Sequence, residues 1–259
     1  MHGPVPSPFL DGDHLAHSSC YAVSMAEIDA RQALVTGAGS GIGRAIALAL
    51  LADGMHVWLV GRDQRKLAQV AENAKGCACV ISADLSRSEE IARVAAALGP
   101  RLDVLVHSAG SYLRGDLASL DGEQWEALDS INVRAPLLLT SACLPRLRAA
   151  QGQIVFVNSS AGLRASAGIG AYSAGKHALR AAADALRQEV NADGIRVLSI
   201  FPGRTDTPMQ RDILASENRS APLGALMRPE DVAIMVVGAL RLPATAEVTD
   251  IIMRPMRPM

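Results

Sequence analysis

The sequence lacks the features that mark nucleic-acid-binding and membrane proteins. Aromatic residues make up only 3% of the 259 residues, so the stacking platforms of single-strand binders are not expected. The 25 basic residues face 26 acidic ones, and the net charge of −1 offers no basic surface for a phosphate backbone. No apolar run approaches the roughly 20 residues of a membrane span. We therefore expect neither a nucleic acid nor a membrane as a partner.

Cysteine is also scarce, and its spacing excludes two further kinds of protein. The four cysteines are Cys20, Cys77, Cys79 and Cys143. They form neither a zinc-binding pattern nor the disulfide framework of a small secreted domain. Free thiols in a protein of the reducing cytoplasm are the expectation.

The first 28 residues differ in composition from the rest of the chain. They lack the basic start and the apolar core of a signal peptide. His14, His17 and Cys20 are spaced three apart there, but this Pro-, Gly- and Ser-containing tail is a poor frame for ligands, and no metal is expected. We predict a disordered extension over residues 1–28 and a single domain over residues 29–259.

Beyond residue 30, short apolar runs alternate with segments of helical composition. Nearly continuous apolar strands need cover on both faces, and strands that alternate with helices indicate parallel βαβ units. The pattern predicts an α/β fold of three α/β/α layers around a doubly wound, Rossmann-type parallel sheet. The runs expected to contain strands are 33–39, 56–62, 77–85, 103–110, 152–162 and 195–203. In the helical segment 88–99, Ser88 is expected to be the N-cap, with Glu89 and Glu90 at the positive end of the helix dipole.

A glycine-rich turn, "VTGAGSGIGR", follows the first of these strands at residues 35–44. Gly37, Gly41 and Gly43 give the spacing T-G-x-x-x-G-I-G and not the strict G-x-G-x-x-G. A loop of this kind between a strand and a helix lets the backbone and the helix N-terminus approach a pyrophosphate. The turn therefore predicts a dinucleotide-binding site.

The end of the second strand indicates which dinucleotide binds. An acidic side chain there would hold the ribose 2′-hydroxyl of NAD, but this chain has Gly61 followed by Arg62. An arginine pairs with a 2′-phosphate, and Ser40 offers a further donor, so NADP is favoured. Asp63 stands close by and keeps NAD as the alternative.

The stretch "AYSAGKHALR" places Tyr172 and Lys176 four residues apart, one helical turn from each other. Alone, such a pair usually belongs to a solvated helix face. A nearby ammonium, however, favours the phenolate and lowers the pKa of a tyrosine, which makes it useful as a general acid or base.

Seven motifs in order resemble those of the classical short-chain dehydrogenase/reductase family over about residues 30–253. They are "TGAGSGIG", "ADL", "HSAG", "IN", "NSSAG", "YSAGK" and "PGRTDT". The resemblance implies a catalytic tetrad of Asn132, Ser159, Tyr172 and Lys176. In this tetrad Tyr172 is the general acid or base, and Ser159 binds the substrate oxygen. Lys176 lowers the pKa of Tyr172 and holds the nicotinamide ribose. Asn132 holds a water that passes protons to Lys176.

The glycine turn and the resemblance together imply a set of cofactor contacts. They are Gly37, Ser40, Gly41, Ile42, Gly43, Arg62, Asp84, Leu85, Ala109, Gly110, Tyr172, Lys176, Pro202, Gly203, Thr205 and Thr207. One departure is visible: Ser108 stands where the family has an Asn that supports the central sheet. We expect a weaker support and not a loss of chemistry. The neighbouring His107 is expected to be a core histidine.

The resemblance implies a homotetrameric or homodimeric oxidoreductase that interconverts a carbonyl and a secondary alcohol. The cysteine usage adds a cytoplasmic location, and Arg62 adds NADP as the cofactor. The segment from Met209 to Met227 is expected to form a lid over the substrate pocket. Its mixed polar and apolar composition does not indicate which substrate binds. The alternative is a regulatory or scaffold protein that binds a nucleotide on the same fold without turnover.

Overall fold

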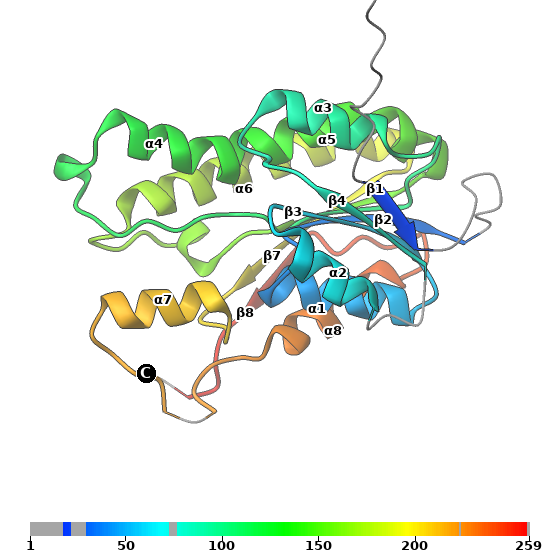
Figure 1. Cartoon of the computed structure of the whole chain (residues 1–259). Helices are drawn as coiled ribbons and strands as arrows, with labels where there is room; N and C mark the ends of the chain where they lie inside the picture. The colour runs from blue at the N-terminus through cyan, green and yellow to red at the C-terminus, as the bar shows by residue number, and fades with distance from the viewer. Residues whose placement is uncertain (1–17, 22–29, 73–76, 223, 258–259) are drawn as a thin grey trace, which may run out of the picture.

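The computed structural model describes residues 18–21, 30–72, 77–222 and 224–257. In them a single sheet lies between two layers of helices (Figure 1), so the predicted three-layer Rossmann-type fold is confirmed. Its eight strands run in the order β1-β4-β3-β2-β5-β6-β7-β8, all parallel except β1, which is antiparallel to β4. They are β1 (Ser18–Tyr21), β2 (Gln32–Thr36), β3 (His56–Gly61), β4 (Ala78–Ser82), β5 (Val104–His107), β6 (Gln153–Val157), β7 (Arg196–Pro202) and β8 (Asp250–Met253).

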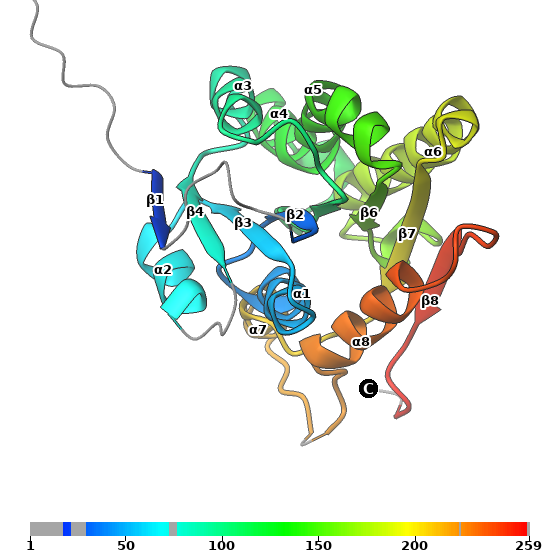
Figure 2. The ribbon, with the colours of Figure 1, turned by 90° about the vertical axis from the view of Figure 1, so that its right-hand side faces the viewer.

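Helices cover both faces of the sheet, which explains why its central strands are apolar on both sides (Figure 2). One apolar cluster joins the sheet to α1, α2 and α8, and a second joins it to α3, α5 and α6. The helices of the first layer are α1 (Gly41–Ala52), α2 (Gln64–Glu72) and α8 (Pro229–Leu240). Those of the second are α3 (Ser88–Ala96), α5 (Ala135–Ala150) and α6 (Gly170–Val190).

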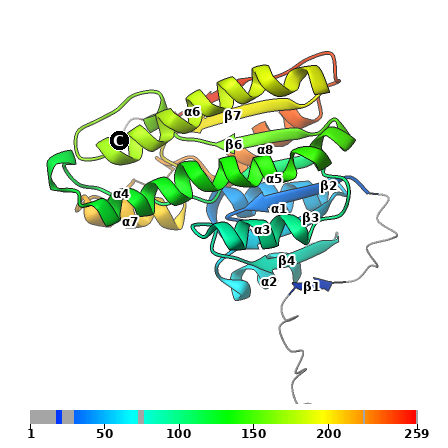
Figure 3. The same ribbon diagram turned by 90° about the horizontal axis from the view of Figure 1, so that it is seen from above.

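The topology opens a crevice at the carboxyl ends of the strands. After β4 the chain returns past β2 and continues on its other side with β5, and such a reversal of strand order leaves room for a ligand. Two further helices, α4 (Gly122–Asp129) and α7 (Pro208–Ser216), extend beyond this end of the sheet (Figure 3). A π-helical turn, η3 (Ser130–Arg134), joins α4 to α5.

Two strands depart from the sequence analysis. The seventh parallel strand, β8, was not among the six predicted, because its four residues lie at the sheet edge and are partly exposed. The segment expected to lack order contains β1 at Ser18–Tyr21. The remaining parts of that segment, 1–17 and 22–29, lie outside the described residues, as do His14 and His17.

Two smaller expectations are wrong. The N-cap of α3 is Arg87, and Ser88 is the first helical residue, although Glu89 and Glu90 do lie in the first turn. Cys79 is disulfide-bonded, so the expectation of free thiols does not hold there.

The surroundings of His107 and the character of the helices bear on two other expectations. His107 is a core residue, as predicted: it is buried, stacks on Phe156 and bonds the Thr140 hydroxyl at 2.8 Å. Among the described residues, no helix combines the length and apolarity needed to cross a membrane.

The Thr36 hydroxyl links the two central strands, β2 and β5, at their carboxyl ends. It donates to the Val106 carbonyl at 3.3 Å and accepts from the backbone N–H groups of Ser108 and Ala109 at 3.0 and 3.1 Å. Thr36 is 1% exposed. The junction of β2 and β5 is therefore held by Thr36, with Ser108 contributing its backbone to it.

Replacing Thr36 by Val should destabilise this junction. The change keeps the side-chain shape but leaves two backbone N–H groups without their acceptor, at a cost of about 1–3 kcal/mol in the free energy of unfolding. Urea unfolding would measure the loss, and Thr245→Val, at an exposed threonine, should change stability by less than about 0.5 kcal/mol. Equal stability of the two variants would contradict this role.

Candidate active site

A cavity of about 900 Å³ opens at the crevice, and every site residue predicted from the sequence lines it. These residues are Gly37, Ser40, Gly41, Ile42, Gly43, Arg62, Asp84, Leu85, Ala109, Gly110, Asn132, Ser159, Tyr172, Lys176, Pro202, Gly203, Thr205 and Thr207. The lining also includes polar residues that the sequence analysis did not name as site residues, among them Ser111, Tyr112, Arg114, Asn158 and Arg204, and two residues of the predicted lid, Gln210 and Glu217. Residues from most of the sheet and from the lid thus meet in one place.

The glycine turn is as tight as its composition requires. Gly37 and Gly41 have φ angles of 66° and 52°, in the left-handed region that favours glycine. A Cβ on Gly43 would lie 2.4 Å from the Gly37 carbonyl oxygen. Ser40, the N-cap of α1, makes no side-chain capping bond, so the N-terminus of α1 opens on the cavity uncapped by its own side chain. A helix N-terminus of this kind suits an anion such as a phosphate.

Asp63, which kept NAD open as an alternative, lines the cavity and uses one carboxylate oxygen to cap a helix. Its Oδ1 accepts from the backbone N–H groups of Arg65 and Lys66 at 3.1 and 3.2 Å, so Asp63 caps α2. The Lys66 backbone bond is the main cause that lowers the pKa of the carboxyl. Arg62 lines the cavity beside it with its backbone carbonyl bound by the Ser82 hydroxyl.

Asp84 also lies at this part of the cavity. Its Oδ1 accepts from both the backbone and the hydroxyl of Ser86, at 3.1 and 2.8 Å. The Ser86 backbone bond is the main cause that lowers the pKa of Asp84. One carboxylate oxygen is thus held by the loop after β4, where the family resemblance places the adenine.

Lys176 is buried at the base of the cavity, on the inner side of α6. It is 5% exposed, and its Nζ donates to the Val157 carbonyl at 3.2 Å. Burial lowers the pKa of Lys176 to about 8. The Nζ lies 5.9 Å from the centre of the Tyr172 ring, so the two side chains share one face of α6, as their spacing predicts. The solvated-surface reading of this pair is therefore wrong.

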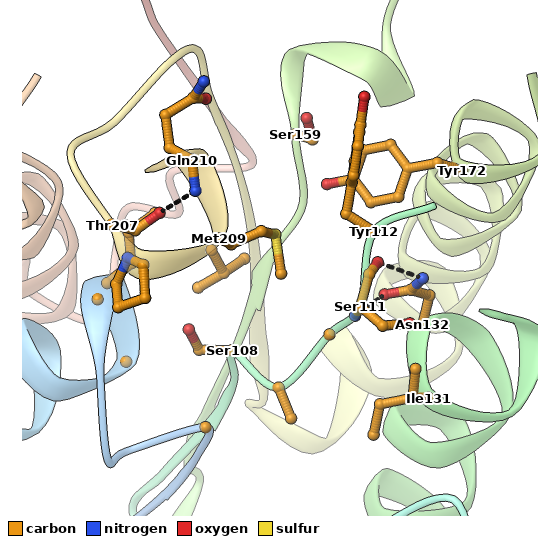
Figure 4. Close-up of a pocket in the computed structure, with 18 of the residues that line it drawn as sticks. Ser108, Ser111, Tyr112, Ile131, Asn132, Ser159, Tyr172, Thr207, Met209 and Gln210 are labelled. Carbon is orange, nitrogen blue, oxygen red and sulfur yellow. Dashed lines mark hydrogen bonds between the residues drawn. The ribbon is translucent and has the colours of Figure 1, made fainter. Parts of the chain in front are cut away.

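The pKa of Tyr172 shifts in the direction opposite to the expectation. Burial raises it, the neighbouring Ser159 hydroxyl opposes that rise, and Tyr112 adds to it. The Tyr112 ring packs edge-on against Tyr172, with 5.1 Å between the ring centres (Figure 4). Loss of solvent is the largest cause at this half-buried phenol and outweighs the Ser159 hydrogen bond, so the lowering expected from Lys176 is not found.

Ser159 lies at the end of β6 with its hydroxyl on the cavity side. Its Oγ accepts from the Ala161 backbone N–H at 3.1 Å, which leaves the hydroxyl proton available for donation. Asn158, the residue before it, is buried and was missed by the sequence analysis. Its Oδ1 accepts from Ser159 N at 2.9 Å and its Nδ2 donates to the Lys176 carbonyl at 3.1 Å. Asn158 therefore ties the strand that carries Ser159 to the helix that carries Lys176.

Asn132 lies in the π-helical turn η3, is 2% exposed, and makes one hydrogen bond with each polar atom of its side chain. Its Nδ2 donates to the Ser111 carbonyl at 2.9 Å, and its Oδ1 accepts from Ser111 N at 3.1 Å (Figure 4). A Cβ on Gly110 would lie 2.9 Å from Asn132 Oδ1 and 3.9 Å from Lys176 Nζ. Glycine at position 110 thus lets Asn132 and Lys176 approach the same loop.

The lid begins where β7 ends. Thr205 is buried and donates to the Gly203 carbonyl at 3.1 Å. Thr207 is the N-cap of α7, because its Oγ1 accepts from Gln210 N at 3.1 Å (Figure 4). Helix α7 faces the cavity with Met209 among other residues, in agreement with the predicted lid.

The chain is similar in sequence to known oxidoreductases. A sequence profile for the family described as "short chain dehydrogenase" matches residues 31–218. An uncharacterised oxidoreductase of Staphylococcus saprophyticus is 32% identical over 240 residues, which cover 90% of this chain and 100% of that protein.

Two solved structures are also similar. An alcohol dehydrogenase from the archaeon Thermococcus sibiricus, complexed with 5-hydroxy-NADP, has a TM-score of 0.80 and 25% identity, covering 88% of this chain and 99% of that one. A metagenomic short-chain oxidoreductase in complex with NADP has a TM-score of 0.75 and 31% identity, covering 88% and 98%.

The buried lysine should make the protein less stable than it could be. The pKa of a lysine is 10.5 in the unfolded chain and about 8 for Lys176 in the fold, so below pH 8 the fold holds a charge that burial disfavours. Lys176→Met should raise the free energy of unfolding at pH 7 by about 1–3 kcal/mol, from 1.36 kcal/mol per pKa unit.

The pH dependence identifies the cause of this gain. Between pH 8 and 10.5 the unfolded chain binds the proton that folded Lys176 has released, so the stability of the native protein rises with pH and the gain from Lys176→Met shrinks. Urea unfolding at pH 7 and 9.5 checks this, with Lys66→Met, at an exposed lysine, as the matched control. A gain that is the same at both pH values would contradict the account.

Proposed function

The chain belongs to the short-chain dehydrogenase family, and from that premise we propose that it is an NADP-dependent oxidoreductase that interconverts a carbonyl and a secondary alcohol. The observation that carries the proposal is the convergence of Tyr172, Ser159 and Lys176 on one cavity with the uncapped N-terminus of α1. Hydride chemistry is supplied by the nicotinamide cofactor that this family binds. The residues of the chain supply binding, orientation and proton transfer.

The cavity residues fit a nicotinamide dinucleotide with a 2′-phosphate. The glycine turn and the N-terminus of α1 would hold the pyrophosphate, and Arg62 would pair with the 2′-phosphate. One oxygen of the neighbouring Asp63 carboxylate caps α2, so only its other oxygen could accept from a ribose hydroxyl. Two solved relatives carry NADP or a derivative of it, which agrees with the same choice.

In the proposed reaction Tyr172 transfers a proton to or from the substrate oxygen. Its raised pKa keeps the phenol protonated in the free protein, ready to act as an acid toward a carbonyl. Ser159 would donate its hydroxyl proton to the same substrate oxygen. The Ser159 Oγ atom already accepts a hydrogen bond from the Ala161 N–H, so the hydroxyl proton is the part of the group that can turn toward the substrate. The two groups would then stabilise the charge that develops on that oxygen.

Lys176 would replace the proton that Tyr172 gives up. Its pKa of about 8 lets it exchange protons near neutral pH, unlike a solvated lysine. Each polar atom of the Asn132 side chain makes one hydrogen bond to Ser111 and keeps a second hydrogen-bonding position, which could hold the water assigned to Asn132. The side chain of Asn132 also positions the loop after β5.

Tyr172→Phe should abolish turnover while leaving nucleotide binding intact. Removing a general acid typically lowers kcat by about 100-fold or more. NADPH consumption with a panel of ketones would measure kcat, and the rise in melting temperature with NADPH would show that the nucleotide still binds. Unchanged turnover would contradict the mechanism.

The two neighbouring serines provide a matched comparison for the same assay. Ser159→Ala should lower kcat about 10-fold or more, through loss of a donor to the oxyanion. Ser160→Ala, one residue later, should not lower kcat to that extent. Nucleotide binding without turnover of any ketone by the native protein would favour the regulatory alternative.

Arg62→Gln should weaken NADPH binding and leave NADH binding unchanged. Losing a charge-assisted contact to the 2′-phosphate corresponds to about a 10-fold or larger rise in the Kd for NADPH. Titration calorimetry with both nucleotides measures the change, and Arg65→Gln, on α2 and away from the cavity lining, is the control. An equal effect on both nucleotides would show that Arg62 does not read the 2′-phosphate.

A further inference from the structure

A carboxylate already lies between arginines of the cavity wall. Glu217, just beyond the end of α7, is 11% exposed. Its Oε1 accepts from Arg114 Nη1 at 3.1 Å and from Arg204 Nη2 at 3.2 Å, and its Oε2 accepts from Arg204 Nη2 at 3.0 Å. Arg219 Nη1 lies 3.8 Å from Oε2. Three segments that follow β5, β7 and α7 therefore meet at a single acidic side chain.

The charges at this part of the cavity do not cancel. Arg114, Arg204 and Glu217 all line the same cavity as Tyr172 and Lys176. The one carboxylate is shared by two arginines of the lining, with a third arginine close outside. Elsewhere along the cavity Arg62 and Lys66 are accompanied by Asp63 and Asp84, and the buried Lys176 is a further cation without a carboxylate beside it in the lining. One excess positive charge of the lining therefore lies where the lid meets the wall, apart from that of Lys176.

Arg204 also has a donor group without an acceptor. Its Nη1 is buried and makes no hydrogen bond within the described residues, although the side chain as a whole is 32% exposed. A buried donor of a charged group that lacks an acceptor is costly, and native structures rarely retain one without a reason. Arg204 therefore keeps its guanidinium in the cavity wall at a cost to stability.

We propose that Arg204 and Arg114 bind the anionic group of the substrate, so that the protein acts on hydroxy acids and oxo acids, compounds with a carboxylate near the reacting carbon. The inference rests on the proposed function and names its substrate class. The Glu217 carboxylate demonstrates that these two arginines can hold such a group, and the substrate would take over donors that now bind Glu217. Glu217 competes with the substrate for the arginines.

A purely structural role makes a different prediction. If the network only fastens the lid to the wall, then loss of Arg204 or of Glu217 loosens the lid in the same way. Binding of charged and neutral substrates would then weaken together for both variants. If the arginines read an anion, the two substitutions change the preference for an anion in opposite directions, because one removes the cation and the other removes its competitor.

The experiment compares two probes that differ in one charge, 3-hydroxybutanoate and its methyl ester. Titration calorimetry on the protein with NADPH bound, and on the protein alone, gives the Kd of each alcohol without turnover. For the native protein we expect the acid to bind about 10-fold more tightly than the ester or better. Turnover of the neutral ester with NADP tests the proposed function separately, so failure of one proposal is distinguishable from failure of the other.

Three variants complete the test. In Arg204→Gln the ratio of ester Kd to acid Kd should fall about 10-fold, and in Glu217→Gln it should rise about threefold or more. Arg211→Gln is the matched control, because Arg211 lies on α7, is 67% exposed and pairs with Asp206 away from the cavity lining. Its ratio should equal that of the native protein.

Each outcome decides the proposal. Opposite changes in Arg204→Gln and Glu217→Gln support an anion site on the arginines. Equal or tighter binding of the ester by the native protein overturns it, and so does a parallel loss of both probes in both variants. If the protein turns over the ester and does not bind the acid more tightly, the proposed oxidoreductase function stands and the proposed substrate class of hydroxy acids and oxo acids is wrong.

Discussion

The burial of the Lys176 ammonium is the constraint on which the catalytic side of the molecule depends. A charged group at 5% exposure is costly unless it finds hydrogen-bond partners, and here it donates to the Val157 carbonyl at 3.2 Å. Asn158 holds strand and helix together at that point through its bonds to Ser159 and Lys176. Gly110 leaves the space through which the ammonium faces the loop after β5.

The same burial governs the chemistry of both titratable groups. Loss of solvent favours the neutral form, so it raises the pKa of Tyr172 and lowers that of Lys176 to about 8. In the free protein the phenol therefore keeps its proton and the lysine holds one that it can release. The buried Lys176 lowers the stability of the fold, and in exchange the protein holds a protonated phenol beside a lysine that can release its proton near neutral pH.

What could be predicted from the sequence was local. The parallel sheet, the glycine turn and the face shared by Tyr172 and Lys176 follow from spacings of a few residues, and all the predicted site residues line one cavity. The missed features depend on contacts across the fold. Arg114 and Glu217 meet although they are 103 residues apart. The pKa of Tyr172 was misjudged because its sequence neighbours do not reveal its burial, and assembly as a homotetramer or homodimer stays a prediction.

Ultraviolet titration of the phenols in the free protein tests this account most directly. The chain has three tyrosines, so the difference between the native protein and Tyr172→Phe isolates a single phenol. The account predicts that Tyr172 ionises above pH 10, because burial raises its pKa. Ionisation of Tyr172 well below pH 10 without nucleotide would contradict it, since Lys176 would then outweigh burial.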